Sequence, residues 1–389
     1  MKQLLSITFI FLFSSFFCFG QTGNTSLKGK VTDKETGEGI AFVSIGIEGT
    51  FLGTASNPDG LFELRIPDEN LQKNLYFSAI GYKNISFPIT DFSQKQDIAI
   101  ALVPQSYKIE EVSVAAESQV LQRILRTVSE QIPTNYLSGP ANLKMYYEER
   151  ESIDNSPSKT NKYIVDLYDA SGYSHPSWAD AYKNRKYQIT ESQTETSALH
   201  FQDASNNLDE ILEMDIARLS NSILNPKLLN DFELKMEART LFDGDSVWIV
   251  SYEATKLDLV HTGSYYPTSF QGKIYIRFSD YAVLRNEIKL AEYKSNPQGR
   301  SLAVKTNPDT KIQMNITIGY KKVNGKFVPA FIDSEKHFTS ASRQSVYESG
   351  KAVILEVSAM NTKPIKNRDY VSNVKTNENF WKNFVAPTN

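Results

Sequence analysis

The feature of this sequence that most restricts its fold is a two-residue period of apolar side chains. From Leu27 to Phe338, short stretches rich in β-branched and aromatic residues are separated by residues that favour turns. Successive side chains of a strand point to opposite faces, so this period predicts half-buried strands, whereas a helix would repeat every 3.6 residues. We therefore expect a mainly β protein.

The first module is expected at residues 26–105. Turn signals at Thr36–Gly39 and Asn57–Gly60 separate about half a dozen short apolar stretches, since Pro58 presets its backbone angle and Gly60 accepts a positive one. Short strands at such spacing predict a small antiparallel sandwich.

Several linked motifs in this module resemble a known domain. The run G-x-V-x-D-x-x-T-G-x-x-I-x-x-V-x-I spans Gly29 to Ile45, G-T-x-S-x-x-D-G-x-F spans Gly53 to Phe62, and F-S-A-I-G-Y spans Phe77 to Tyr82. Together they resemble the carboxypeptidase regulatory-like domain. The resemblance implies a transthyretin-like Greek-key sandwich of the kind found in secreted and outer-membrane proteins. It implies no zinc site, because this domain accompanies carboxypeptidases without containing their metal ligands.

Residues 106–133 are expected to join the two modules. The segment Tyr107–Val114 alternates in polarity, which predicts a last strand or a linker strand. It is also similar to the acidic, valine-rich box that follows the same domain in some TonB-dependent transporters. Residues 118–132 place their apolar side chains on one helical stripe, so we predict an amphipathic helix that packs on a core and ends at Pro133.

The larger module, residues 134–389, shows three hairpin signals, at Phe232–Tyr252, Gly272–Ile288 and Ile312–Phe338. The third contains Asn324-Gly325, a strong signal for a tight turn. A further helix is predicted at Leu208–Ile223, closed by Pro226. We expect a long antiparallel meander with one or two packed helices.

Such a meander can curl into a half-barrel over an apolar cavity. The order of elements is weakly similar to that of lipoprotein-carrier half-barrels, which implies a concave face that takes acyl chains. Short motifs around Ile124–Arg126, Ile132–Tyr136 and Tyr146–Glu151 also resemble exported proteins of unassigned function. The alternative is an ordinary sheet core filled by its own side chains.

The first 20 residues have the layout of a secretory signal peptide. Lys2 precedes an apolar run from Leu4 to Phe19, and the chain turns polar at Gln21, so we expect cleavage between Gly20 and Gln21. An uncleaved anchor and a lipid on Cys18 are the alternatives. No later segment is apolar enough to cross a bilayer, and we expect an exported protein, in the periplasm, associated with the outer membrane, or secreted.

The sequence offers no recognisable catalytic or metal-binding motif. A net charge of −3 gives no broad attraction for nucleic acid. None of the four histidines forms the H-x-x-E pair of a zinc carboxypeptidase, and the single cysteine, Cys18, leaves with the signal. We therefore predict no catalytic residue, no metal site and no cofactor.

The strongest indication of a binding site is a cluster of aromatic residues. Its members are Tyr173, His175, Trp178, Tyr182 and Tyr187. Aromatic faces beside hydrogen-bonding groups can stack on sugars or peptides. Sheets also favour Tyr and Trp for packing alone, so a structural role is the alternative.

Three functions follow from these observations. The first is a non-enzymatic cell-envelope protein, in which the sandwich is a structural or interaction module and the larger module binds a partner protein, a glycan or an apolar ligand. The second is a periplasmic carrier of lipid or lipoprotein, which predicts a continuous apolar lining. The third is a hydrolase of a cell-wall or dietary polymer, which predicts a cleft with two inward carboxyl groups, one having a raised pKa.

Overall fold

The computed structural model describes most of the chain after the expected signal peptide. The described residues are 24–48, 50, 52–92, 97–107, 114–154, 156–194, 208–209, 211–243, 245–264, 266–293, 311–339, 343–366, 374, 376–384 and 386–387, with the backbone alone at 24, 106, 107, 114–116, 178 and 182. The expected cleavage site at Gly20 and Gln21 and the lipid-acceptor alternative at Cys18 lie outside these residues.

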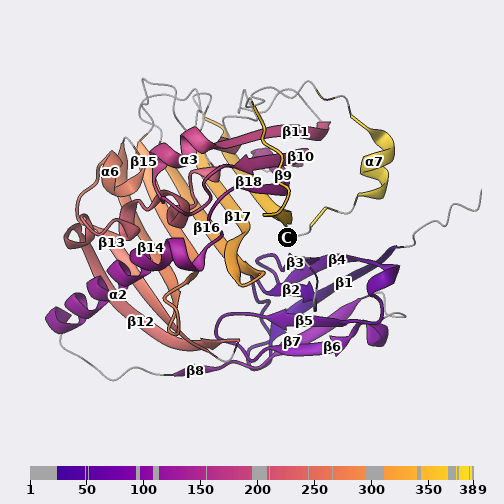
Figure 1. Ribbon diagram of the computed structural model, residues 1–389, viewed down its shortest axis with the longest axis horizontal. Helices are drawn as coiled ribbons and strands as arrows, with labels where there is room; N and C mark the ends of the chain where they lie inside the picture. Colours follow the sequence, from indigo (N-terminus) through magenta and orange to yellow (C-terminus); the bar gives the residue numbers. More distant parts are fainter. Residues whose placement is uncertain are drawn as a thin grey trace, which may run out of the picture.

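The N-terminal module is a sandwich of two sheets, drawn in indigo and purple in Figure 1. One sheet has the order β4-β1-β7 and the other β3-β2-β5-β6. The strands are β1 (Asn24–Asp33), β2 (Ser44–Ile47), β3 (Gly53–Ala55), β4 (Leu61–Pro67), β5 (Asn74–Ser78), β6 (Ile85–Pro88) and β7 (Ile98–Leu102), with 3-10 turns η2 (Asp68–Asn70) and η3 (Ile89–Phe92). Val31, Ile45 and Phe77 are fully buried between the sheets. The predicted sandwich is confirmed, but it is not wholly antiparallel, because β1 pairs with β7 in parallel.

The larger module is built on one open sheet of 11 described strands, in which all neighbours are antiparallel. Their order is β11-β10-β9-β18-β17-β16-β15-β14-β13-β12-β8. The strands are β8 (Ser106–Tyr107), β9 (Ala141–Ile153), β10 (Lys159–Asp169), β11 (Arg185–Thr194), β12 (Phe232–Phe242), β13 (Asp245–Ala254), β14 (Pro267–Arg277), β15 (Val283–Tyr293), β16 (Lys311–Val323), β17 (Lys326–Thr339) and β18 (Ser345–Ser358). The sheet does not close, since β11 and β8 lie at opposite edges.

The three predicted hairpins are confirmed as β12–β13, β14–β15 and β16–β17. In the last one, Asn324 and Gly325 have φ values of 48° and 80°. Two successive positive φ angles are what a two-residue turn needs to match the twist of its strands, and Asn and Gly adopt them at low cost. Turn chemistry therefore explains why this register was predictable.

Helix α2 (Val114–Asn135) crosses one face of the large sheet, which we call the inner face (Figure 1). Its buried stripe, including Leu125 and Val128, belongs to the same core as strand residues such as Ile274, and the helix lies closest to β12. The predicted end at Pro133 is wrong, because the helix continues to Asn135. A proline so near the end removes only one helical hydrogen bond, and buried Ile132 and Tyr136 hold the last turn in the core. No described helix is long and apolar enough to span a membrane.

The predicted continuous helix at Leu208–Ile223 is also wrong. This segment forms short pieces that include α5 (Ile216–Leu219) and η4 (Ser222–Leu224), followed by η5 (Leu229–Asp231). Asp215 caps α5 by accepting a hydrogen bond from the Arg218 N–H, and Ser220 and Ser222 have φ values of 49° and 50°. The cap at Asp215 starts a new helix, and the left-handed backbone at Ser220 and Ser222 ends it. The helix is therefore interrupted although the apolar spacing continues.

The remaining helices are short. They are α3 (Trp178–Asn184), α6 (Leu259–Thr262) and α7 (Glu378–Asn383). Trp381 of α7 packs with Tyr146 and Ile164 on the other face of the large sheet, the outer face, and donates a hydrogen bond to the Ser192 carbonyl at 2.9 Å. Helix α7 thereby covers part of β9 and β10 on the outer face of the large sheet.

The two modules contact each other through Phe42. Its ring stacks on Phe331 of β17 at a centroid distance of 5.1 Å, and the Arg285 guanidinium lies 4.5 Å from its centre. Phe42 has a φ of 58°, an uncommon angle for an aromatic residue. The Gly81 N–H adds a hydrogen bond to the Leu241 carbonyl at 3.1 Å. The sandwich is thus anchored to the large sheet as well as linked to it.

We expect Phe42→Ala to loosen this junction by about 1 kcal/mol, since the stack and the cation–π contact are lost. Hydrogen exchange at the Gly81 amide, which bonds across the junction, should become about fivefold faster. Leu61→Ala, at an exposed position of the same module, is the matched control. Unchanged exchange in the Phe42 variant would show that the stack does not hold the modules together.

Candidate functional site

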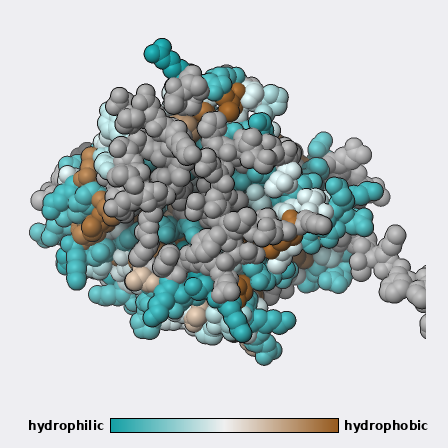
Figure 2. Space-filling model, turned by 90° about the horizontal axis from the view of Figure 1, so that it is seen from above, coloured by the Kyte–Doolittle hydropathy of each residue, from teal (hydrophilic) through white to brown (hydrophobic). Residues whose placement is uncertain are grey.

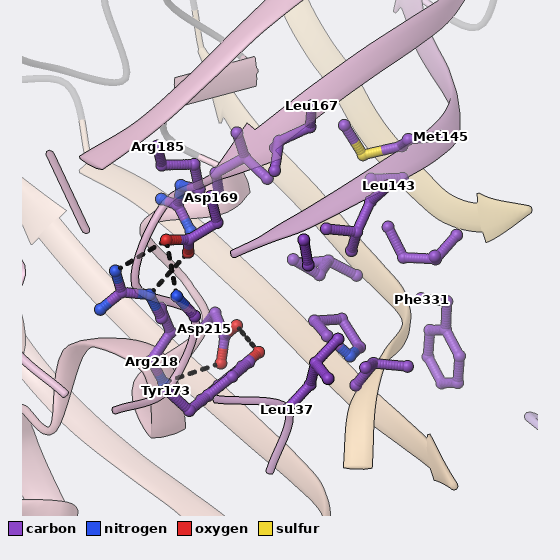
Figure 3. A pocket seen from close by; sticks show the side chains of 18 residues that line it. Leu137, Leu143, Met145, Leu167, Asp169, Tyr173, Arg185, Asp215, Arg218 and Phe331 are labelled. Atoms are coloured by element: carbon purple, nitrogen blue, oxygen red, sulfur yellow. Dashed lines mark hydrogen bonds and ion pairs between the residues drawn. The ribbon is translucent and has the colours of Figure 1, made fainter. Parts of the chain in front are cut away.

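A cavity lies against the inner face of the large sheet, between β9, β10, β17 and β18 and the segment that contains α5 (Figure 3). It is partly open to solvent and has a volume of about 50 Å³. Most of its lining is apolar: Leu137, Ala141, Leu143, Met145, Leu167, Leu212, Val328, Pro329, Phe331, Ile332, Ala352 and Ile354. Native cores hold few voids larger than one water molecule, so a space of this size is a feature to be explained.

Glycines allow the walls of the cavity to approach each other. A β-carbon on Gly350 of β18 would lie 2.4 Å from the end of the Ile211 side chain, so a larger residue here would have to displace that side chain. Gly172 has a φ of 51°, and its added β-carbon would lie 2.3 Å from the Leu137 carbonyl oxygen. Both positions bring loop residues onto the strands that form the cavity.

One end of the cavity is closed by a buried ion pair. Arg218 of α5, only 1% exposed, donates from Nε to Asp169 Oδ2 at 2.8 Å and from Nη2 to Asp169 Oδ1 at 3.2 Å. Nη2 also donates to the Ser171 hydroxyl at 2.9 Å, and Nη1 to the His175 carbonyl at 3.4 Å. Asp169, at the end of β10, further accepts the Gly172 N–H at 2.9 Å. This pair ties α5 to the end of β10.

Asp215 lies beside the ion pair among tyrosine hydroxyls. Tyr173 donates to its Oδ2 at 2.5 Å and Tyr320 to its Oδ1 at 2.8 Å. Burial raises the pKa of the Asp215 carboxyl above its usual value, although the hydrogen bonds from Tyr173, Tyr320 and Arg218 oppose this effect. The Asp215 carboxyl is therefore protonated more readily than an ordinary exposed aspartate.

Arg185, the first residue of β11, also lines the cavity and is 8% exposed. Burial lowers the pKa of its guanidinium, while the charges of Asp169 and Asp215 act in the opposite direction. Two cations and two carboxyl groups thus meet at one end of an otherwise apolar space (Figure 3).

The five residues that were predicted to bind a ligand lie in different surroundings. Tyr173 lines the cavity, Tyr187 is buried in the core of the larger module, and His175 is exposed. The side chains of Trp178 and Tyr182 lie outside the described residues. Their joint role in binding stays a prediction, and the part of it that meets the cavity is Tyr173.

Sequence reasoning missed the four charged residues of the cavity. Asp169, Arg185, Asp215 and Arg218 are spread over 50 positions and form no motif. The only local signal is that Asp215 lies three residues before Arg218, a spacing that permits an N-cap. This spacing does not predict that Arg218 pairs with Asp169, 49 positions away.

No group of three metal-ligating side chains occurs among the described residues. On the face seen in Figure 2, the described surface is largely hydrophilic, and its brown areas are small and separate. The cavity is therefore the feature of the described structure best suited to an apolar ligand.

A second titratable cluster lies at α6, where His261 contacts two carboxylates. Its Nδ1 lies 2.7 Å from Asp258 Oδ1, and its Nε2 lies 3.0 Å from Asp231 Oδ2. Burial lowers the pKa of His261, but these hydrogen bonds outweigh it and raise the pKa above 6.5. The hydrogen bond from Lys256 and then that from His261 lower the pKa of Asp231, and His261 lowers the pKa of Asp258. With both nitrogens engaged by carboxylates, His261 is a structural clamp.

We expect this clamp to make stability depend on pH. The contribution of His261 is fully present below pH 6.5 and is lost as pH rises through the raised pKa. The contribution of the two carboxylates is present above pH 3.8 and is lost as pH falls through their lowered pKa values. Urea midpoints of the wild type and His261→Gln should therefore differ most between these limits. His175→Gln, at an exposed position, is the control, and a constant difference from acid to alkaline pH would contradict the clamp.

Comparison with known proteins adds a domain family for the first module. Residues 27–114 match the family model of the CarboxypepD_reg-like domain, which confirms the resemblance found in the sequence. A search of curated proteins gave no match.

Two solved structures show distant similarity. A LolA superfamily protein from Nitrosomonas europaea is 8% identical, with 62% of this chain and 94% of that chain covered and a TM-score of 0.24. A DUF1329 family protein from Desulfovibrio piger is 10% identical, with 64% and 95% covered and a TM-score of 0.26. At these scores neither similarity assigns a function to this chain.

Proposed function

We propose that this chain, whose residues 27–114 match the CarboxypepD_reg-like domain, is an exported binding protein that holds an apolar ligand in its inner-face cavity. The observation that carries the proposal is the cavity itself: an apolar space, partly open to solvent, with charged side chains at one end only. A concave, mainly apolar site with a few convergent polar groups is the usual form of a small-ligand pocket.

The packing around the cavity favours binding over a defect of the core. Ala141 and Ala352 line it from neighbouring strands, and both are 1% exposed. These small side chains leave room above the sheet at this place. Burial of apolar ligand surface in the cavity stabilises the complex by about 25 cal/mol for each Å² removed from water. A ligand with a short acyl segment therefore fits the chemistry of the walls.

The sandwich is proposed as a structural and interaction module. Phe331, which lines the cavity, is the residue on which Phe42 of the sandwich stacks. The module thus contacts a residue that forms part of the cavity wall. Export to the periplasm or the outer membrane is part of the same proposal and follows from the signal-like N-terminus.

The proposal is tested by native mass spectrometry of the protein purified gently from its own host, followed by extraction and identification of any retained molecule. A stoichiometric acyl or other apolar species is expected. A protein that carries none, and that takes up none when incubated with a lipid extract of its host, would overturn the proposal.

One observation favours a second function, that of a hydrolase. Two carboxyl groups, Asp169 and Asp215, line the cavity, and the pKa of Asp215 is raised. However, both Asp169 oxygens are engaged by Arg218, which leaves this carboxylate poorly placed to activate water. Incubation with chromogenic esters and glycosides tests this function. Turnover that disappears in Asp215→Asn would favour the hydrolase over the binding protein.

A further inference from the structure

We propose that the turn around α6 is a membrane-docking tip, whose apolar side chains insert into the surface of a phospholipid bilayer. The inference goes beyond the proposed function, because it concerns another surface of the larger module and involves no residue that lines the cavity. The tip is defined by five exposed apolar residues: Leu257, Leu259, Val260, Tyr266 and Tyr293.

These five side chains gather at one end of the larger module. Helix α6 lies at the end away from the sandwich and contacts β14, which Tyr266 directly precedes (Figure 1). Tyr293, the last residue of β15, donates its N–H to the Tyr266 carbonyl at 3.0 Å. All five are between 39% and 62% exposed. Turns that face solvent are normally polar, so apolar side chains grouped on one of them indicate an interaction site.

Polar contacts, and not burial of the apolar side chains, fix the backbone of the tip. Asp258 accepts hydrogen bonds from the N–H groups of Val260 and His261, both at 3.0 Å. Gly263 ends the turn with a φ of 76°, and the His261 clamp joins it to Asp231. The apolar side chains are therefore held toward solvent before any partner arrives, which lowers the entropy cost of docking.

The charges near the tip suit a lipid surface. Both carboxylates of the clamp are already engaged, by His261 and, in the case of Asp231, also by Lys256. Lys311, opposite Tyr293 in the β15–β16 pair, is exposed. Tyrosine favours the membrane interface, and a lysine can reach phosphate groups while its stem lies in apolar surroundings. The aliphatic, tyrosine and lysine side chains thus match the hydrocarbon, interface and phosphate layers of a bilayer.

The size of the tip favours a bilayer over a protein partner. A stable protein–protein interface takes about 20–30 residues on each side, whereas the tip offers five apolar side chains. A bilayer surface needs no complementary shape, so each inserted apolar side chain leaves water at once. A lipid surface is therefore a better match than a second copy of this chain or a groove of another protein.

The test is co-sedimentation of the mature protein with vesicles of phosphatidylcholine alone and with vesicles that also contain phosphatidylglycerol. We expect the protein to partition onto both, because insertion of the apolar side chains does not require lipid charge. The anionic vesicles should bind no more than about fivefold more tightly, which is the effect of one lysine near an anionic surface.

Two variants locate the contact. Leu257→Asp should lower partition at least about tenfold, because it places a carboxylate in the apolar layer. Leu61→Asp is the matched control, since Leu61 of the sandwich is 46% exposed and Leu257 is 42% exposed, and it should partition like the wild type.

A third variant gives a gain instead of a loss. Val260→Trp should partition more tightly than the wild type, because tryptophan favours the membrane interface. Its fluorescence should also be quenched more than that of the wild type by vesicles whose acyl chains carry bromine. This result remains decisive if Leu257→Asp does not fold.

Several outcomes would overturn the proposal. They are no partition of the wild type onto either vesicle, equal partition of the wild type and folded Leu257→Asp, and no added quenching in Val260→Trp. Partition that needs phosphatidylglycerol and disappears at high salt would show that surface charge holds the lipid. Self-association that Leu257→Asp abolishes, without vesicle binding, would assign the tip to a second copy of the chain. None of these outcomes decides whether the cavity holds a ligand, so the two proposals fail separately.

Discussion

Arg218→Ala is expected to lower the free energy of unfolding by about 3–5 kcal/mol, because it removes the guanidinium that donates to both oxygens of the buried Asp169 carboxylate. Arg218 also joins α5 to Ser171 and the His175 carbonyl, so these contacts are lost together. Denaturant unfolding followed by circular dichroism measures the change.

The matched control is Lys144→Ala, which removes an ion pair with Asp166 at 3.3 Å whose partners are 39% and 35% exposed. An exposed pair contributes about 0–1 kcal/mol, so this variant should unfold nearly like the wild type. Equal effects of the two substitutions would show that the buried pair does not hold α5 to the sheet.

Ala352→Leu is expected to weaken binding of an acyl ligand at least tenfold. The added carbons project from β18 into a cavity of about 50 Å³ and occupy the space of the ligand. Because the new side chain fills a void, the fold should survive at a cost of no more than about 1–3 kcal/mol. Equilibrium titration with butanoate, whose acyl chain is short enough for the cavity, measures the loss.

Ala101→Leu provides the control for this substitution, since it makes the same change at an exposed position of β7. Its affinity should equal that of the wild type. Unchanged affinity in folded Ala352→Leu would place the ligand elsewhere on the molecule.

Much of the fold could be predicted because it follows from local rules. The Asn324-Gly325 turn sets the register of β16–β17, and the motifs from Gly29 to Tyr82 identify the sandwich. The Leu208–Ile223 helix could not be predicted correctly. Its apolar spacing is helical, yet Asp215 caps a new helix and is held in place by Tyr173 and Tyr320 from distant parts of the chain.

The candidate site was largely beyond prediction for the same reason. Asp169 and Arg218 pair only because β10 and α5 meet on the inner face, and no spacing in the sequence predicts that contact. The predicted aromatic cluster shares one residue with the cavity, Tyr173, and its role in binding stays a prediction. It could not distinguish a core tyrosine such as Tyr187 from a lining one, because both occupy apolar surroundings.

The most direct test of the central claim is a crystal structure of the mature protein with butanoic acid brominated at its far end. The account predicts anomalous density for bromine inside the cavity, near Met145 and Ile332. Bromine density confined to other places, with the cavity filled only by water or side chains, would contradict it.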